Sequence, residues 1–180
     1  KNLRTYLLNQ LQLFFFRLCH LFPKIWKDSH IVPIPKIKQP TEEEHTRPIS
    51  LTSCISKVLE DFVVHWMISD VGDKIDSQQF GSLKGSSTTY CLLDMLHSWL
   101  GHLDCPGQYL RVCFLDFSKA FDRIGHNVLI QKLVDIGVRR SLIPWIVSFL
   151  SGRRQFVKLG EAISSWLPVK AGVPQGTKLG

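Results

Sequence analysis

The sequence predicts an α/β fold, because strand-like and helix-like segments alternate along the chain. An apolar, β-prone run at 109–115 is too short for a core helix and is typical of a buried strand. Through 50–69, apolar residues recur at helical spacing. Two further β-prone runs, 153–159 and 164–170, flank a glycine turn and predict a hairpin.

The composition bounds the class of protein. Hydrophobic residues make up 44% of the 180 residues, which is typical of a globular protein and not of a disordered one. The formal net charge of +7 favours a polyanionic partner, although it does not distinguish nucleic acid from an acidic membrane. The five cysteines are odd in number and form no Cys-x-x-Cys pair, so we expect a reducing compartment and neither a disulfide framework nor a zinc ribbon.

The N-terminal stretch at 2–22 is strongly apolar, and its spacing predicts an amphipathic helix that packs against the core. Polar residues such as Asn9, Gln12 and Arg17 interrupt it before it reaches the roughly 20 apolar residues that a membrane span needs. Pro23 then ends the helix. We therefore expect no membrane partner.

A short extended segment follows at Ile31–Ile34. The prolines at 33 and 35 cannot donate to a sheet ladder, so an edge strand is predicted. Lys36 and Arg47 stand on either side of the polar loop that comes next. Lysine binds a phosphate as a point charge and arginine binds it bidentately, but charges at a strand edge also serve ordinary solubility. Both interpretations stay open on these residues alone.

The clearest helix is predicted at 50–69, with its apolar side chains on one face and no chemistry assigned to it. We expect Lys57, Glu60 and Asp61 to lie off that face. The predicted core positions are Leu51, Ile55, Val58, Leu59, Phe62, Val63, Trp66 and Met67.

A glycine-containing loop at 78–89 leads into a second helix at about 86–100, for which Ser86 or Ser87 is the expected N-cap. The loop is no phosphate-binding P-loop, because Lys84 comes before its second glycine rather than after it.

Two carboxylates follow the strand predicted at 109–115. Asp116 stands at its C-terminal end and Asp122 follows six residues later. A carboxylate at that end of a strand, facing a cleft, can hold Mg²⁺ by one or two oxygens and leave the remaining positions to substrate phosphates. The alternative is that Asp116 caps the next turn, and the stretch alone does not separate the two.

Two more helices are predicted in the C-terminal half, at 126–136 with Gly137 just past its end, and at 141–150. His126 is interpreted as a structural or capping residue. Inward positions in the second helix are Trp145, Ile146 and Phe149. The hairpin after it carries a basic face, either a solvated surface or a phosphate-tracking one, made of Arg153, Arg154, Lys158 and Lys170.

Four segments together resemble the reverse transcriptases of non-LTR retrotransposons. Asp116-Phe-Ser-Lys-Ala-Phe-Asp122 resembles the first catalytic motif of that family, and Ala171-Gly-Val-Pro-Gln-Gly-Thr-Lys-Leu-Gly180 resembles another motif of the same palm. Arg47-Pro-Ile-Ser-Leu-Thr-Ser and Gln79-Phe-Gly-Ser-Leu-Lys-Gly-Ser-Ser-Thr match two fingers motifs, in the family's order. The family usually has an aromatic and a basic residue where Ser82, Leu83 and Lys84 stand, so that local match is imperfect.

The resemblance implies a right-hand polymerase. Residues to about 108 would form an N-terminal helix and the fingers, and 109–180 would form the first part of a palm with an antiparallel sheet backed by helices. The implied reaction is RNA-directed DNA synthesis with an RNA template, a DNA primer and deoxynucleoside triphosphates. Two Mg²⁺ ions, or Mn²⁺ in their place, would assist it. The chain would be made in the cytosol and act on DNA in the nucleus.

The resemblance also implies roles for single residues. Asp116 would be the catalytic metal ligand, and Asp122 a turn or structural carboxylate. Phe121 would be the bulky residue under the sugar that excludes ribonucleotides. The other implied nucleotide contacts are Lys36, Arg47, Phe117, Gln175 and Gly176, and the implied nucleic-acid contacts are Lys84, Arg153 and Arg154.

One part of the family pattern has no counterpart here. The family needs an aromatic-x-Asp-Asp hairpin after the Pro-Gln-Gly loop, and no Asp-Asp pair occurs in the 180 residues. We therefore expect these residues alone not to polymerise. One alternative is a non-catalytic, nucleic-acid-binding remnant of a decayed element. Another is a Mg²⁺-dependent hydrolase for which Asp116 and Asp122 are both essential.

Overall fold

The computed structural model describes Tyr6, Gln10 and residues 21–180, so the helix predicted at 2–22 lies almost wholly outside the described residues. The chain divides into two compact units, each described here by itself. The first, which we call the sheet unit, combines 1–72 with 119–180, and the second, the α3 unit, comprises 73–118. Among the described helices, none is both long and apolar enough to cross a membrane. The expected division into fingers and palm near residue 108 stays a prediction.

Five strands in the described part of the sheet unit form one sheet, in the order β2-β1-β3-β4 with β5 also paired to β3. Most of its pairs are antiparallel, as predicted, but β1 and β3 run parallel. The α/β fold class is confirmed. The strands are β1 (Asp28–Pro35), β2 (Thr46–Leu51), β3 (Arg154–Leu159), β4 (Ala162–Ile163) and β5 (Leu167–Pro168). The predicted hairpin is thus present, with its second arm split in two.

The prediction that the segment around Ile31–Ile34 is an edge strand is wrong. Strand β1 has a neighbour on each side: β2 pairs with residues 30–35 and β3 with residues 28–31. Pro33 and Pro35 lie beyond the part that β3 covers, so each has a strand on one side only. A residue without an N–H group is tolerated at such a position.

The buried strand predicted at 109–115 is also wrong for this structure. The segment has no strand, and the side chains of Phe114 and Leu115 are 76% and 87% exposed. A β-prone sequence becomes a strand only when a neighbour satisfies its backbone groups. None of the described strands pairs with this segment.

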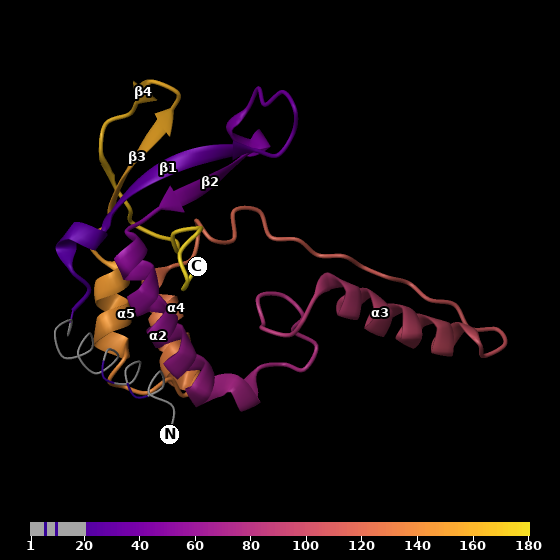
Figure 1. Cartoon of the computed structure of the whole chain (residues 1–180). Coiled ribbons are helices and arrows are strands. Elements are labelled where there is room, and N and C mark those ends of the chain that lie inside the picture. The colour runs from indigo at the N-terminus through magenta and orange to yellow at the C-terminus, as the bar shows by residue number, and fades with distance from the viewer. Residues whose placement is uncertain (1–5, 7–9, 11–20) are drawn as a thin grey trace. The chain divides into compact units, whose positions relative to one another are not determined.

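Two helices of the sheet unit agree with their predicted positions, whereas the third begins at Cys54 rather than at Ser50, because Ser50 and Leu51 belong to strand β2. The three helices are α2 (Cys54–Val71), α4 (His126–Ile136) and α5 (Ile143–Leu150), and they lie together below the sheet in Figure 1. Gly137 ends α4 in the left-handed conformation, with φ 100°. Single-turn 3₁₀ helices occur at Lys24–Trp26, Glu43–His45 and Gly72–Lys74.

An aromatic core joins these helices. Trp145 and Phe149 of α5 stack at 5.7 Å between ring centroids, and Phe22 meets both rings edge-on. Helix α2 adds Leu59 and Val63 to this core. The inward positions predicted for α5 are therefore confirmed.

The buried face of α2 differs from the predicted one. Ile55 and Val58 are 55% and 50% exposed, whereas Glu60 is fully buried. The buried positions Ser56, Leu59, Glu60 and Val63 follow i, i+3, i+4, i+7 spacing, so the helix is regular but turned from the expected orientation. Because Ser56 and Glu60 on that face are polar, the spacing of apolar residues alone does not predict it.

The α3 unit contains α3 (Thr88–Leu103). Ser87 is its N-cap, because its hydroxyl accepts a hydrogen bond from the Tyr90 amide at 3.3 Å. No residue of α3 is buried, and its leucines remain about half exposed.

Candidate functional site

A cavity of about 450 Å³ opens on one face of the sheet. Its walls come from β1, β2 and β3, from Lys119 and Asp122, and from the segment 168–175. The polar and charged side chains in this lining are Ser29, Glu43, Thr46, Ser50, Lys119, Asp122, Gln155, Lys170 and Gln175.

Alternation along the strands decides which residues face this cavity. On β2 the lining residues are Thr46, Pro48 and Ser50, and β1 and β3 contribute alternate residues in the same way. Successive side chains of a strand point to opposite faces of the sheet. Arg47 and Arg154 therefore lie on the face that turns away from the cavity.

The loop after β5 approaches the backbone of residues 121–124 very closely. The Gly172 amide donates to the Ile124 carbonyl at 2.9 Å, and the Val173 amide donates to the Phe121 carbonyl at 2.8 Å. A Cβ atom at Gly172 would lie 2.6 Å from the Phe121 carbonyl oxygen, and the φ angle there is +83°. Both the space and the backbone conformation require glycine at 172.

The same loop is tied to the end of β2. The Ser50 amide donates to the Gln175 carbonyl at 2.8 Å. A Cβ atom at Gly176 would lie 3.2 Å from the Ser50 carbonyl oxygen, so this approach is tight as well. Segments around residues 50, 121 and 175, far apart in the sequence, thus meet at one cavity.

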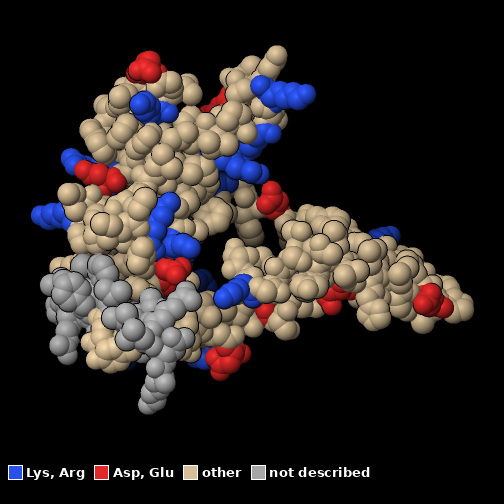
Figure 2. Space-filling view, in the orientation of Figure 1, with Lys and Arg blue, Asp and Glu red and all other residues tan. Residues whose placement is uncertain are grey.

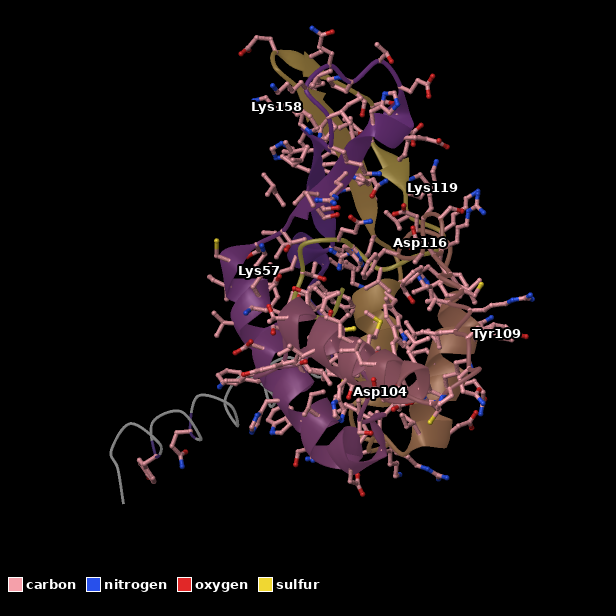
Figure 3. The ribbon with its side chains drawn as sticks, turned by 90° about the vertical axis from the view of Figure 1, so that its right-hand side faces the viewer. Lys57, Asp104, Tyr109, Asp116, Lys119 and Lys158 are labelled. Atoms are coloured by element: carbon pink, nitrogen blue, oxygen red, sulfur yellow. The ribbon has the colours of Figure 1, made fainter. Side chains whose placement is uncertain are left out.

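Lys119 is the cation that sequence reasoning missed. Lys119, labelled in Figure 3, lines the cavity beside the sheet. Its Nζ lies 3.6 Å from Glu43 Oε1. The Glu43 side chain is 87% exposed, so this ion pair is weak and leaves Lys119 accessible to an anion. The only available signal was its place between Asp116 and Asp122, because its spacing matches no phosphate-binding pattern.

Comparison with known proteins then decides the family. Residues 34–180 match the family model described as "Reverse transcriptase (RNA-dependent DNA polymerase)". The chain belongs to the reverse transcriptase family. Enzymes of this family use divalent metal ions and act on nucleic-acid templates and nucleotide substrates.

Relatives of this reverse transcriptase chain are encoded by insect mobile elements. It is 33% identical over 167 residues to "Probable RNA-directed DNA polymerase from transposon BS" of Drosophila melanogaster, and 35% identical over 162 residues to the same kind of protein from transposon X-element. Each alignment covers 88% of this chain and 18% of the relative. A "Retrovirus-related Pol polyprotein" from element R2 of Popillia japonica is 22% identical over 158 residues. The chain therefore spans about a fifth of the length of these relatives.

The predicted site residues of this reverse transcriptase chain are distributed over both units. Asp122 and Gln175 meet at the cavity, which Phe121, Lys36 and Arg47 do not line. Phe121 contributes its carbonyl to the loop anchor, while its side chain is 45% exposed. Lys36 lies just past β1, with its Nζ donating to the Glu44 carbonyl at 2.9 Å. Figure 2 shows several exposed Lys and Arg side chains on the surface of the sheet unit.

Asp116, Phe117 and Lys84 are exposed residues of the α3 unit. Asp116, labelled in Figure 3, is exposed, so its carboxylate is accessible to a ligand. Within the described ranges, no group of three or more His, Cys, Asp or Glu residues could hold a metal ion. Asp116 can thus be one ligand of a divalent ion, but not a complete site.

The basic surface predicted for the hairpin is partly wrong. Arg153 is 2% exposed, and its guanidinium lies 4.9 Å from the Phe149 ring centroid. Burial lowers the pKa of Arg153 from its ordinary value. Arg154 is on the surface as predicted, but it pairs with Asp28 at 2.6 Å and lies over the Trp166 ring.

His126 serves as a structural residue, as predicted. Its Nε2 lies 2.8 Å from the Gly172 carbonyl oxygen, so it supports the loop that borders the cavity. The functional roles predicted for the other site residues stay predictions.

Proposed function

We propose that this chain forms the fingers and the first part of the palm of a non-LTR retrotransposon RNA-directed DNA polymerase. One observation carries the proposal: parts of three family-like motifs meet at one cavity. These are Ser50 from the first fingers motif, Lys119 and Asp122 from the first palm motif, and Ala171–Gln175 from the last. Hydrogen bonds between their backbones hold the three together.

The cavity suits a nucleotide. A volume of about 450 Å³ lies in the range of small-molecule sites. Lys119 supplies a positive charge for a phosphate, and Gln175 and Ser50 supply polar groups that can orient a sugar or base. Because Arg47 faces away from this cavity, its proposed contact with the triphosphate needs a ligand that extends around the sheet edge.

In the proposed reaction, the 3′-hydroxyl of a DNA primer attacks the α-phosphate of a deoxynucleoside triphosphate opposite an RNA template, and pyrophosphate leaves. Divalent ions, for which we propose Mg²⁺, would supply charge neutralisation for this transfer when bound. Asp116 would be one ligand, which fits the preference of Mg²⁺ for one or two carboxylates together with substrate phosphates. The chain's other groups position the substrate, and Phe121 would exclude the 2′-hydroxyl.

The remaining roles concern nucleic acid. Lys84 and Arg154 are exposed and basic, and we propose that they contact the template or primer backbone. Arg154 would exchange its pairing with Asp28 for a phosphate, which is inexpensive because both partners are partly exposed.

The test is primer extension by the longer protein that carries this chain. With an RNA template, a DNA primer and Mg²⁺, we expect extension that Asp116→Ala reduces by at least about a thousandfold, because a lost metal ligand removes several kcal/mol of transition-state stabilisation. Asp104→Ala, an exposed carboxylate of the same unit, is the matched control and should retain activity. The 180 residues alone should not extend the primer.

Two results would contradict the proposal. Retained extension by Asp116→Ala would show that this carboxylate is no metal ligand. A longer protein that binds the primer–template but never extends it would favour the remnant with no chemistry.

A further inference from the structure

A buried carboxylate connects α2 to the loop at the cavity. Glu60 is fully buried, and each of its two oxygens accepts one hydrogen bond. The Ser56 hydroxyl donates to Oε1 at 2.9 Å, and the Lys178 backbone amide donates to Oε2 at 2.8 Å. Burying a carboxylate is costly unless such partners compensate for lost water, so this placement demands an explanation.

The segment that Glu60 holds is a tight turn. The Pro174 carbonyl accepts hydrogen bonds from the Thr177 hydroxyl at 2.9 Å and from the Thr177 amide at 3.4 Å. Gly176, third in the turn, has a φ angle of +94°, as a type II turn requires. Gln175 is then the second residue of the turn, and it is one of the residues that line the cavity. Lys178 is the first residue after the turn.

The turn is therefore held at both ends. Before it, Gly172 and Val173 are bonded to the backbone of residues 121–124. After it, the Lys178 amide is bonded to Glu60. Within the turn, the Gln175 carbonyl also accepts from the Ser50 amide at 2.8 Å. Without the second anchor, the chain beyond Thr177 could rotate, and the turn would be fixed only at Gln175 and on its N-terminal side.

We propose that Glu60 is a positioning residue, whose carboxylate clamps the turn Pro174–Thr177 through the Lys178 amide and so directs Gln175 into the cavity. The hydrogen-bond geometry supports the clamp itself, whereas its effect on nucleotide binding rests on the proposed function. Glu60 touches no substrate and acts through the turn.

Burial and hydrogen bonding act in opposite directions on the charge of the Glu60 carboxylate. Burial raises the pKa of Glu60 above its ordinary value, whereas the hydrogen bonds from Lys178 and Ser56 and the charge of Arg153 act in the opposite direction. An ionised carboxylate accepts from both donors at once. The buried Arg153 therefore acts on Glu60 through its positive charge and is not a surface contact.

The neighbouring residue offers a matched control. Asp61 also reaches Lys178, but through the Lys178 ammonium group, at 3.4 Å, and both side chains are more than half exposed. Asp61→Asn removes a carboxylate charge next to Glu60 without touching the backbone bond that clamps the turn.

The experiment measures residue-resolved amide hydrogen exchange on this chain. In Glu60→Gln a neutral amide oxygen replaces a carboxylate oxygen as the acceptor for the Lys178 amide, and hydrogen bonds to neutral acceptors are weaker than those to charged ones. We expect the Lys178 amide to exchange about tenfold faster or more, while amides of α5 change by less than about twofold. Asp61→Asn should leave the Lys178 amide unchanged. Equal exchange of that amide in Glu60→Gln and the unaltered chain would overturn the clamp.

A titration with dTTP and Mg²⁺ separates this inference from the proposed function. If both hold, Glu60→Gln weakens dTTP binding about tenfold and Asp61→Asn does not. If the unaltered chain binds no dTTP, the nucleotide role of the cavity fails, while the exchange result still decides the clamp. Should Glu60→Gln not fold, Glu60→Asp replaces it, because it keeps the charge near Arg153 and withdraws the carboxylate from Lys178, and the same change in exchange is expected.

Discussion

The two compact units of this chain both contain helices rich in large apolar side chains, but those side chains are buried in only one unit. In the sheet unit, Trp145 and Phe149 are 2% and 1% exposed. In the α3 unit, Leu96 and Leu100 are 48% and 58% exposed. The difference teaches that local spacing is enough to form a helix, but burial depends on partners from elsewhere in the chain.

The largest expected effect tests this contrast in packing. Trp145→Ala should lower the free energy of unfolding by about 3–5 kcal/mol, because it empties the centre of the aromatic core. Leu96→Ala in α3 should change it by less than about 0.5 kcal/mol, because the side chain is half exposed. Urea unfolding followed by circular dichroism measures both. A comparable loss in Leu96→Ala would mean that α3 is packed in solution.

The second prediction compares one glycine from each unit, and it tests how closely the backbone is packed there. Gly172 and Gly107 both have positive φ angles, +83° and +79°, but only a Cβ at Gly172 would meet other atoms. Gly107→Ala should therefore cost about 1 kcal/mol from conformation alone. Gly172→Ala should cost about 3 kcal/mol, because the loop must also move away from residues 121 and 122.

Thermal unfolding of the two variants gives the comparison directly. Equal losses in melting temperature would show that the loop at 172 is not held against the backbone of 121–124.

The smallest effect concerns the surface of the sheet unit. Asp70 accepts hydrogen bonds from the Arg139 amide at 3.0 Å and from its guanidinium at 2.9 Å, and this hydrogen bonding lowers the Asp70 pKa below its ordinary value of 3.8. The stabilisation is therefore present above about pH 3.8 and is lost as the pH falls through the lower folded-state pKa. Asp70→Asn should cost about 1 kcal/mol at pH 7 and less at pH 2, because protonation of the carboxylate weakens its pairing with Arg139.

Urea unfolding at the two pH values measures this, with Asp135→Asn as a control, because Asp135 accepts a hydrogen bond from Gln131 of its own helix and is exposed. A loss that is equally large at pH 2 would assign the effect to packing rather than to the ion pair.

Local features of the fold could be predicted from the sequence. The Ser87 cap, the Gly137 terminus and the inward face of α5 each depend on residues within one or two helical turns. The parallel pairing of β1 with β3 could not be predicted, because it joins residues 126 positions apart. The same applies to Glu60 and Arg153, whose burial depends on partners in other parts of the chain.

The residues of the candidate site could also be predicted only in part. Resemblance placed Asp122 and Gln175 in functional motifs, and both line the cavity. It also named Arg47 as a nucleotide contact and assigned no role to Lys119, although strand alternation turns Arg47 away from the cavity and Lys119 lines it. Side-chain direction depends on the register of the sheet, which four short motifs do not specify.

The parallel pairing of β1 with β3 has a consequence for synthesis on the ribosome. Strand β1 can form a hairpin with β2 early, but its other neighbour lies 126 residues further along. At about 5–20 residues per second, that interval lasts roughly 6–25 s. During this time the nascent hairpin presents an open hydrogen-bonding edge at residues 28–31, where other chains could add. A trigger for aggregation, or a binding site for a ribosome-associated chaperone, would therefore exist only until β3 emerges.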